Sequence, residues 1–194
     1  LLTKNNFKRS ILDYCLFYKH YNNSYIYIVV YVDDLLILYN HDSEIEEFIQ
    51  NIKTKVTEIK ITKGNTHSFL GMHLTINENG IVVDMDGYTR SFLEYYNNTF
   101  YHVKSRKIPS SNNLLLEDEE SKPLSTTAKA HFHTVVAKLL YLAKRTRPDI
   151  LLPISYLTRK VTKPTLEDAE KLERIVGYLQ EFPKYNILFK NGMD

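Results

Sequence analysis

The first half of the chain is a series of short hydrophobic runs rich in β-branched and aromatic residues, a pattern typical of strands. Turn residues separate these runs: Asn22-Asn23 follows the first run, and Asn79-Gly80 is a strong hairpin signal. The sequence therefore predicts strands at residues 14–19, 25–30, 35–39, 68–76 and 81–83.

Residues 43–56 place hydrophobic side chains at helical spacing, which predicts an amphipathic helix with one buried face. Ser43 is its expected N-cap, because Glu46 follows three residues later as in a capping box. Nearer the start of the chain, residues 6–13 are expected to close a further helix. The predicted buried face of the 43–56 helix consists of Ile45, Phe48, Ile49, Ile52 and Val56.

The second half of the chain is expected to be mainly helical. Asp86 is the predicted cap of a helix, and the polar residues 97–126 that follow predict a linker or a long loop. Thr165 opens a last helix, which Pro183 ends. The hydrophobic positions of the three helices are Tyr88, Phe92, Leu93 and Tyr96; then Phe132, Val135, Val136, Leu139, Leu140 and Ala143; then Leu166, Ala169, Leu172, Ile175, Val176, Leu179 and Phe182.

The composition is that of an ordinary globular protein, and 194 residues suffice for one domain or two small ones. Cys15 is the single cysteine, which excludes an internal disulfide and fits a reducing compartment. Its apolar neighbours predict a buried packing residue. No apolar run is long enough to cross a bilayer, and we expect no signal peptide. These features predict an intracellular protein with no membrane partner.

Asp33 and Asp34 stand between two hydrophobic runs, at the point where a turn is expected. Adjacent carboxylates near a hydrophobic core need a partner, because burial disfavours their charged form. A divalent metal ion is a suitable partner, since hard cations prefer oxygen ligands. The alternative is an ordinary turn, in which Asp side chains form hydrogen bonds with nearby backbone groups.

The net charge is only +2, so the distribution of charge is more informative than the total. Basic residues gather between positions 138 and 163, where Asp149 is the one acidic residue, and this pattern suits a phosphate backbone. A solvated helix face is the alternative. His131 and His133 are a weak indication of zinc, against which a structural role stands as the alternative. The basic residues are Lys138, Lys144, Arg145, Arg147, Arg159, Lys160 and Lys163.

Three sequence blocks, in the same order along the chain, resemble the reverse transcriptases of Ty1/copia-type LTR retrotransposons. The first is YVDD at residues 31–34, which resembles the YxDD catalytic hairpin and is preceded by DYCLF at residues 13–17. The second, FLGMHL at residues 69–74, resembles the primer grip. The third, VVAKLLYLAKRTRPDI at residues 135–150, resembles the block that follows the palm. The resemblance covers palm and thumb, and the fingers are missing from it.

This resemblance implies an α+β fold, in which a polymerase palm with a catalytic β-hairpin is followed by a helical thumb. Residues 1–85 would be the C-terminal part of the palm, including the primer-grip hairpin. Residues 86–126 would be a connecting helix and loop, and residues 127–194 would be the helical thumb.

The resemblance also implies roles for individual residues. Asp33 and Asp34 would be the catalytic residues and the metal ligands. Tyr31 would lie against the primer end and Val32 would face the nucleotide sugar. The primer would be steadied by Leu70, Gly71 and Met72. The thumb would contact nucleic acid through Lys138 and through one helix face with residues four apart, formed by His133, Ala137 and Tyr141.

The implied function is that of a fragment of an RNA-directed DNA polymerase, a nucleotidyltransferase that adds deoxynucleotides to a primer by two-metal phosphoryl transfer. Two Mg²⁺ ions are expected in the complete enzyme. The expected partners are an RNA or DNA template-primer duplex, deoxynucleoside triphosphates and the remainder of a DNA-integration polyprotein, with its fingers, RNase H and integrase. The expected location is a cytoplasmic particle or the nucleus.

The chain departs from the family pattern in two respects. The family's third aspartate precedes YxDD on a neighbouring strand, and Asp13 does not take its place. Because this third aspartate and the fingers are missing, we expect the chain to be inactive as a polymerase by itself. The chain also opens at Leu1 without a methionine, so it looks like a fragment. Ala137 stands where the family usually has glycine, and its methyl group would crowd a minor groove. The alternative function is a decayed or repurposed, non-enzymatic module that binds nucleic acid or another protein.

Overall fold

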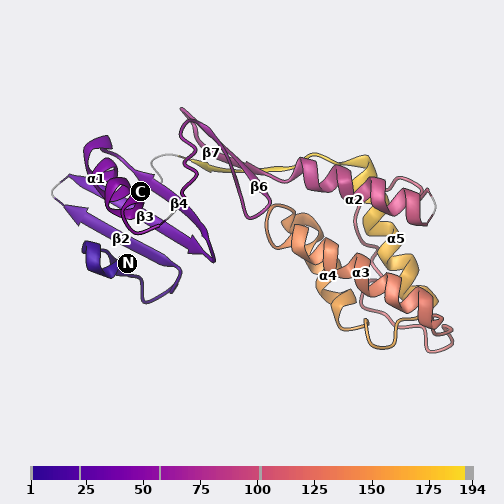
Figure 1. The fold of residues 1–194 in the computed structure, drawn as a ribbon. Helices are drawn as coiled ribbons and strands as arrows, with labels where there is room; N and C mark the ends of the chain where they lie inside the picture. Colours follow the sequence, from indigo (N-terminus) through magenta and orange to yellow (C-terminus); the bar gives the residue numbers. More distant parts are fainter. Residues whose placement is uncertain (1, 22, 57, 101, 191–194) are drawn as a thin grey trace. The chain divides into compact units, whose positions relative to one another are not determined.

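The computed structural model describes residues 2–21, 23–56, 58–100 and 102–190. In these residues the chain is mixed α and β, with two antiparallel sheets and five α-helices (Figure 1). Contacts divide the chain into two compact units, Leu1–Gly64 and Asn65–Asp194. Among the described helices, none combines the length and the apolarity needed to cross a membrane.

The first unit is a four-stranded antiparallel sheet in the order β1-β2-β3-β4, with helix α1 packed against it. Ile26 and Ile28 lie on the same face of β3, because side chains alternate along a strand, and they share a core with Phe48 of α1. The predicted strands are confirmed with shifts of at most two residues. The elements are η1 (Thr3–Asn5), β1 (Lys8–Arg9), β2 (Leu16–Tyr21), β3 (Ser24–Tyr31), β4 (Asp34–Tyr39) and α1 (Asp42–Lys53).

The predicted helix over residues 6–13 is wrong. Asn6 adopts a left-handed conformation with φ of 63°, which ends the short 3-10 helix η1, and strand β1 follows. After β1 the backbone turns, and the Ser10 side chain stabilises the turn: Ser10 Oγ accepts hydrogen bonds from the amides of Leu12 and Asp13. Such local bonds compete with helix formation.

The helix predicted over residues 43–56 is confirmed, but its ends are not. Helix α1 begins at Asp42 after His41, so Ser43 lies inside the first turn and is not the N-cap. The helix ends at Lys53, and Val56 lies beyond it with 43% of its surface exposed. In the predicted turn, Asn23 is a turn residue, whereas Asn22 lies outside the described residues.

The second unit combines a four-stranded antiparallel sheet, in the order β5-β6-β7-β8, with helices α2 to α5. The helices enclose the larger core, to which all four contribute, and Leu139, Leu157, Ile175 and Leu179 are completely buried there. The elements are β5 (Thr66–Phe69), β6 (Met72–Asn77), β7 (Gly80–Asp84), α2 (Asp86–Thr99), α3 (Thr126–Ala143), η2 (Pro148–Ile150), α4 (Leu151–Thr158), α5 (Leu166–Glu181) and β8 (Asn186–Lys190).

The single strand predicted over residues 68–76 is wrong, because the chain reverses in the middle of it. Leu70 and Gly71 both have positive φ, 52° and 76°, and form a two-residue turn between β5 and β6. Two positive φ values are typical of a type I′ hairpin turn. The hairpin predicted at Asn79-Gly80 is confirmed, although Gly80 is the first residue of β7 and pairs with Asn77.

The predicted helices of the second unit are confirmed as α2, α3 and α5. Thr165 caps α5 as predicted, and it forms a reciprocal capping box with Asp168. Helix α2 starts at Asp86 itself, so Met85 is its N-cap in place of Asp86. Helix α4, which contains Pro153, was not predicted from the sequence. Proline is tolerated there since it lies in the first turn, where no backbone N–H is needed.

The loop predicted over residues 97–126 is confirmed for residues 102–125, which contain no helix and no named strand. Residues 97–99 instead belong to α2, and Thr126 begins α3. The loop is nevertheless packed against the helices. Val103 and Leu114 are buried in the helical core, and the Arg106 amide donates a hydrogen bond to the Gly177 carbonyl of α5. The loop is therefore part of the helical unit.

Candidate functional site

The β3–β4 hairpin carries the aspartate pair at its tip. Tyr31 pairs with Asp34, which leaves Val32 and Asp33 as the two residues of the turn. Val32 has a φ of 53°, a rare conformation for a β-branched residue, which costs conformational energy. Its side chain is 82% exposed and that of Tyr31 is 52% exposed. The turn thus holds an apolar and an aromatic side chain out into solvent beside the two carboxylates.

Both Asp33 and Asp34 are exposed, which corrects the expectation that they lie near a core. Their charges keep their hydration, so burial does not force them to find a partner. Their adjacent carboxylates supply oxygen ligands of the kind that a hard divalent cation prefers, but only part of the ligands that such a cation needs. Within the described segments of the chain, no group of three or more potential metal ligands is assembled, either here or around His131 and His133.

The residues predicted to steady a primer lie in the second unit, at the turn between β5 and β6. The Tyr141 hydroxyl of α3 donates a 2.9 Å hydrogen bond to the Leu70 carbonyl. A Cβ atom built on Gly71 would come within 2.5 Å of the same hydroxyl oxygen. Met72 is partly buried and packs against the helical core. The structure therefore brings together four of the predicted residues, Leu70, Gly71, Met72 and Tyr141.

Tyr141 belongs to a small cluster of rings and cations. The Tyr88 ring of α2 lies 5.1 Å from the Tyr141 ring, between centroids, and the Arg145 guanidinium lies 3.6 Å above the Tyr141 ring. Arg145 also donates a hydrogen bond to the Tyr141 carbonyl. Burial is the largest cause of the raised pKa of Tyr88. The Lys138 ammonium lies 4.7 Å above the Tyr95 ring, so it is held against α2.

His133 and Ala137 are exposed on α3, as a role in binding a duplex requires. His131 is partly buried, and its ring meets the Phe100 ring edge-on at 5.2 Å. That contact favours the structural reading of His131. Cys15 is exposed, which corrects its prediction as a buried packing residue, because it lies just before β2, where the chain runs over the surface.

The basic stretch between residues 138 and 163 is not one continuous cationic surface. Arg147 is only 1% exposed and donates three hydrogen bonds to the Asp149 carboxylate. Lys160 forms an ion pair with Glu117. Lys144, Arg159 and Lys163 remain exposed, so fewer cations are accessible to phosphate than the sequence suggests.

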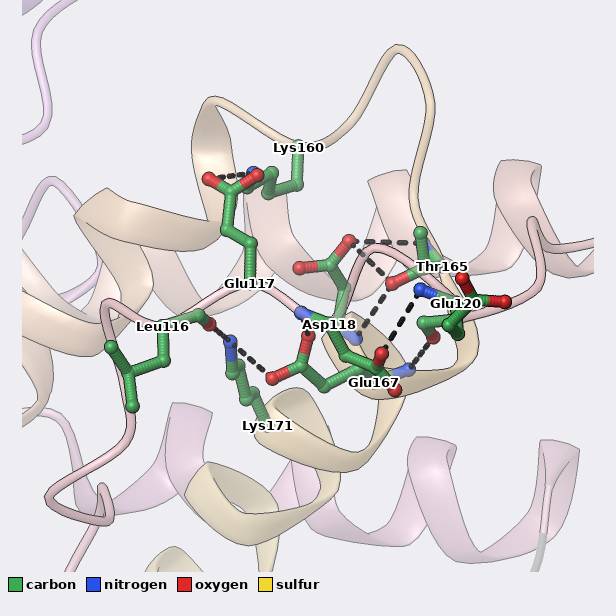
Figure 2. Close-up of polar contacts among 10 residues, drawn as sticks. Leu116, Glu117, Asp118, Glu120, Lys160, Thr165, Glu167 and Lys171 are labelled. Atoms are coloured by element: carbon green, nitrogen blue, oxygen red, sulfur yellow. Dashed lines mark hydrogen bonds and ion pairs between the residues drawn. The ribbon is translucent and has the colours of Figure 1, made fainter.

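The sequence reasoning missed an acidic clasp, which we define as residues 116–121 of the long loop (Figure 2). Figure 2 shows Lys171 of α5 between the Leu116 carbonyl and the Glu167 carboxylate. The Asp118 amide donates a hydrogen bond to Glu167, which is the main cause of the lowered pKa of Glu167. The hydrogen bond from Lys160 likewise lowers the pKa of Glu117. The run of four acids at residues 117–120 was the available signal.

Comparison with known proteins agrees with the resemblance. Residues 1–110 match the family model described as reverse transcriptase (RNA-dependent DNA polymerase). The chain is 28% identical over 201 residues to a Saccharomyces cerevisiae protein named "Putative transposon Ty5-1 protein", with 98% of the chain and 60% of the relative covered. It is 29% identical to the retrovirus-related Pol polyprotein from transposon RE1 of Arabidopsis thaliana, with 96% of the chain and 12% of the polyprotein covered.

A third relative is an uncharacterized mitochondrial protein of Arabidopsis thaliana, which is 26% identical over 159 residues. That match covers 80% of the chain and 61% of the relative. The chain thus spans less than two thirds of the length of each of these relatives. No solved structure matches the chain.

Proposed function

The chain belongs to the reverse transcriptase (RNA-dependent DNA polymerase) family, and from this premise we propose that it is the palm and thumb part of a Ty1/copia-type retrotransposon polymerase. In this proposal residues 1–85 belong to the palm, residues 86–126 connect, and residues 127–194 form the thumb. One observation carries the proposal: the β3–β4 hairpin, inside the family match, presents two adjacent carboxylates at an exposed turn.

Asp33 and Asp34 would hold Mg²⁺ through their carboxylate oxygens, which are ligands of the type that Mg²⁺ prefers. When bound, the metal would polarise the primer 3′-hydroxyl and offset the negative charge of the leaving pyrophosphate. A third carboxylate for this site is not gathered beside them in the described residues. We therefore expect the 194-residue chain to add nucleotides poorly without the remainder of its polyprotein.

The neighbouring residues would position the substrates. Tyr31 would lie against the primer end and Val32 would face the sugar of the incoming deoxynucleoside triphosphate; both are exposed, as contact with substrate requires. Leu70, Gly71 and Met72 would steady the primer strand. The exposed residues of α3 would follow the template-primer duplex by its shape and backbone, as a polymerase that accepts any sequence must do.

Primer extension tests this proposal. In the complete polymerase that contains this sequence, Asp33→Asn and Asp34→Asn should each abolish extension and leave duplex binding intact, whereas Asp13→Asn should retain activity. Extension that survives Asp33→Asn would refute the assignment of the site. Efficient, Asp33-dependent synthesis by the 194-residue chain alone would instead refute its expected incompleteness.

A second candidate function is nucleic-acid binding without synthesis. Two relatives favour it: the Ty5-1 protein, of which the chain covers 60%, and the mitochondrial protein, of which it covers 61%. Both proteins are far shorter than the RE1 polyprotein, of which the chain covers 12%. Duplex binding that weakens steeply with salt, together with a lack of extension in the complete protein, would favour this second function.

A further inference from the structure

The turn between β5 and β6 has a conformation that its sequence does not favour. Phe69 and Met72 close the turn, and Leu70 and Gly71 between them have φ of 52° and 76°. Glycine adopts such a φ readily, but leucine does so rarely and at a cost. A contact from elsewhere in the unit can offset the strain at Leu70.

Tyr141 supplies that contact. Its hydroxyl donates a 2.9 Å hydrogen bond to the carbonyl of Leu70, 71 residues away in the chain. The hydroxyl occupies the space that a side chain at position 71 would need, since a Cβ there would lie 2.5 Å from the oxygen and 3.6 Å from Cζ. Glycine at position 71 thus serves both the turn and the approach of the tyrosine.

Tyr141 is itself held from two helices. The Tyr88 ring of α2 packs beside it, and the Tyr88 hydroxyl donates a 3.2 Å hydrogen bond to the Lys138 carbonyl of α3. Arg145, just beyond the end of α3, lies 3.6 Å above the Tyr141 ring and donates a hydrogen bond to the Tyr141 carbonyl. A hydroxyl placed by packed helices is a more rigid anchor for the turn than a side chain on a loop.

We propose that Tyr141 is a positioning residue, which fixes the Leu70-Gly71 turn against α3 and so sets where the turn meets the primer strand. The part about the primer rests on the proposed function, but the mechanical link between Tyr141 and the turn does not. The assignment differs from a direct contact of Tyr141 with the minor groove, because here the hydroxyl acts on nucleic acid only through the turn.

A double-mutant cycle on the 194-residue chain tests the mechanical link. Gly71→Ala should be tolerated better in the Tyr141→Phe background, because phenylalanine removes the oxygen that lies 2.5 Å from the new Cβ. We expect Gly71→Ala to lower the folded-to-unfolded ratio at least about fivefold more in the wild type than in the Tyr141→Phe variant. Simple additivity of the two substitutions would overturn the proposal.

Kinetics of the complete polymerase test the consequence for the primer. Tyr141→Phe should lower kcat about tenfold, because a small misplacement of a reacting end is costly, and should change the Kd for primer-template less than about twofold. Thr158→Val is the matched control, since it also removes a hydroxyl-to-carbonyl bond, the one from Thr158 to Ser155 in α4, but does not touch Tyr141 or the turn. Its kcat should stay near the wild-type value.

Each other outcome has a distinct meaning. An unchanged kcat in Tyr141→Phe would overturn the positioning role, and so would a selective rise in Kd, which would indicate direct contact with the duplex. Asp33→Asn, measured in parallel, separates the two proposals. If it leaves extension intact, the proposed function fails, while the double-mutant cycle still decides whether Tyr141 holds the turn.

Discussion

Arg147 illustrates how a residue that resembles a nucleic-acid contact can be structural. Its guanidinium is buried, makes a forked pair with Asp149, and donates a 2.8 Å hydrogen bond to the Phe182 carbonyl just after α5. The rings of Tyr178 and Tyr185 lie 5.5 and 5.3 Å from it. Arg147 thus joins the end of α3 to the end of α5. Arg147, which the charge pattern placed in a basic stretch suited to a phosphate backbone, is therefore a packing residue.

Replacement of this arginine should therefore cost stability. Arg147→Lys keeps the charge but cannot form the planar fork to the Asp149 carboxylate and the Phe182 carbonyl together. We expect the free energy of unfolding to fall by about 3 kcal/mol, in the range found when a buried charge pair is disrupted. Urea denaturation followed by circular dichroism would measure the change.

Lys144→Ala is the appropriate control for that substitution, because Lys144 is an exposed cation three residues away. It should change the free energy of unfolding by less than about 0.5 kcal/mol. If Arg147→Lys instead preserved stability and weakened duplex binding, Arg147 would be a phosphate contact and its structural assignment would be wrong.

Among the elements, β8 shows what hydrophobic periodicity alone cannot reveal. Residues 186–190 follow the last helix and pair with β7 from the far end of the unit, in the register Gly80 with Lys190. Gly80 has φ of 135° and is buried against the backbone of Phe189. Pairing of strands so distant in sequence depends on the fold of the helices between them, which a local pattern does not contain.

Gly80→Ala should loosen the β7–β8 pair. The added methyl group would collide with the Phe189 carbonyl oxygen, and alanine is strained at this φ. We expect faster amide hydrogen exchange in β7 and β8 and a lower melting temperature. Gly87→Ala is a matched control, because no atom outside its chain neighbours and its own helix backbone lies within 4 Å of its new Cβ, and it should leave exchange in β8 unchanged. Equal exchange in the two variants would contradict the pairing.

The acidic clasp gives a second prediction at this scale. The pKa of Glu167 is lowered chiefly by the Asp118 amide, and the pKa of Glu117 by its hydrogen bond with Lys160. A lowered pKa in the folded state means that these carboxylates stabilise the clasp at pH above their ordinary value of 4.5. That contribution is lost as the pH falls from 4.5 through the lower folded values.

Hydrogen exchange of residues 116–121, corrected for the intrinsic effect of pH, should therefore increase as the pH falls below about 4.5. Glu167→Gln should expose the clasp to exchange even at pH 7, because the amide is a weaker acceptor for Asp118 and Lys171. An exchange rate that is insensitive to both acid and Glu167→Gln would show that these ionic contacts do not hold the loop.

Much of the fold was predictable from local pattern, and the exceptions have physical causes. The strands β2, β3 and β4 and the helices α3 and α5 follow hydrophobic periodicity closely. The Leu70-Gly71 turn was missed, because leucine at positive φ is not a turn signal. The grouping of Tyr141 with that turn arises from tertiary packing. The turn at Asp33 and Asp34 was expected, but the exposure of these residues was missed, since flanking hydrophobic runs do not show how far a hairpin tip stands out from the core.

At the scale of the whole molecule, the predicted site residues are divided between the two units. Tyr31, Val32, Asp33 and Asp34 belong to the first unit, and the turn residues with Tyr141 belong to the second. Each unit has a hydrophobic core of its own. The carboxylates and the turn can therefore be held rigidly within their units by independent sets of contacts.

Two separate cores predict that the units respond independently to substitutions in their interiors. Phe48→Ala removes a ring from the core of the first unit, and Leu139→Ala removes a buried side chain from that of the second. Losses of about 3–5 and 2–5 kcal/mol are expected from cavities of these kinds. In hydrogen exchange, Phe48→Ala should raise the rates in β3 and α1 and leave those in α3 and α5 unchanged. Leu139→Ala should do the reverse. If either substitution accelerated exchange throughout the chain, the two units would unfold in one cooperative transition. The carboxylates and the Leu70-Gly71 turn would then depend on the same free energy of unfolding.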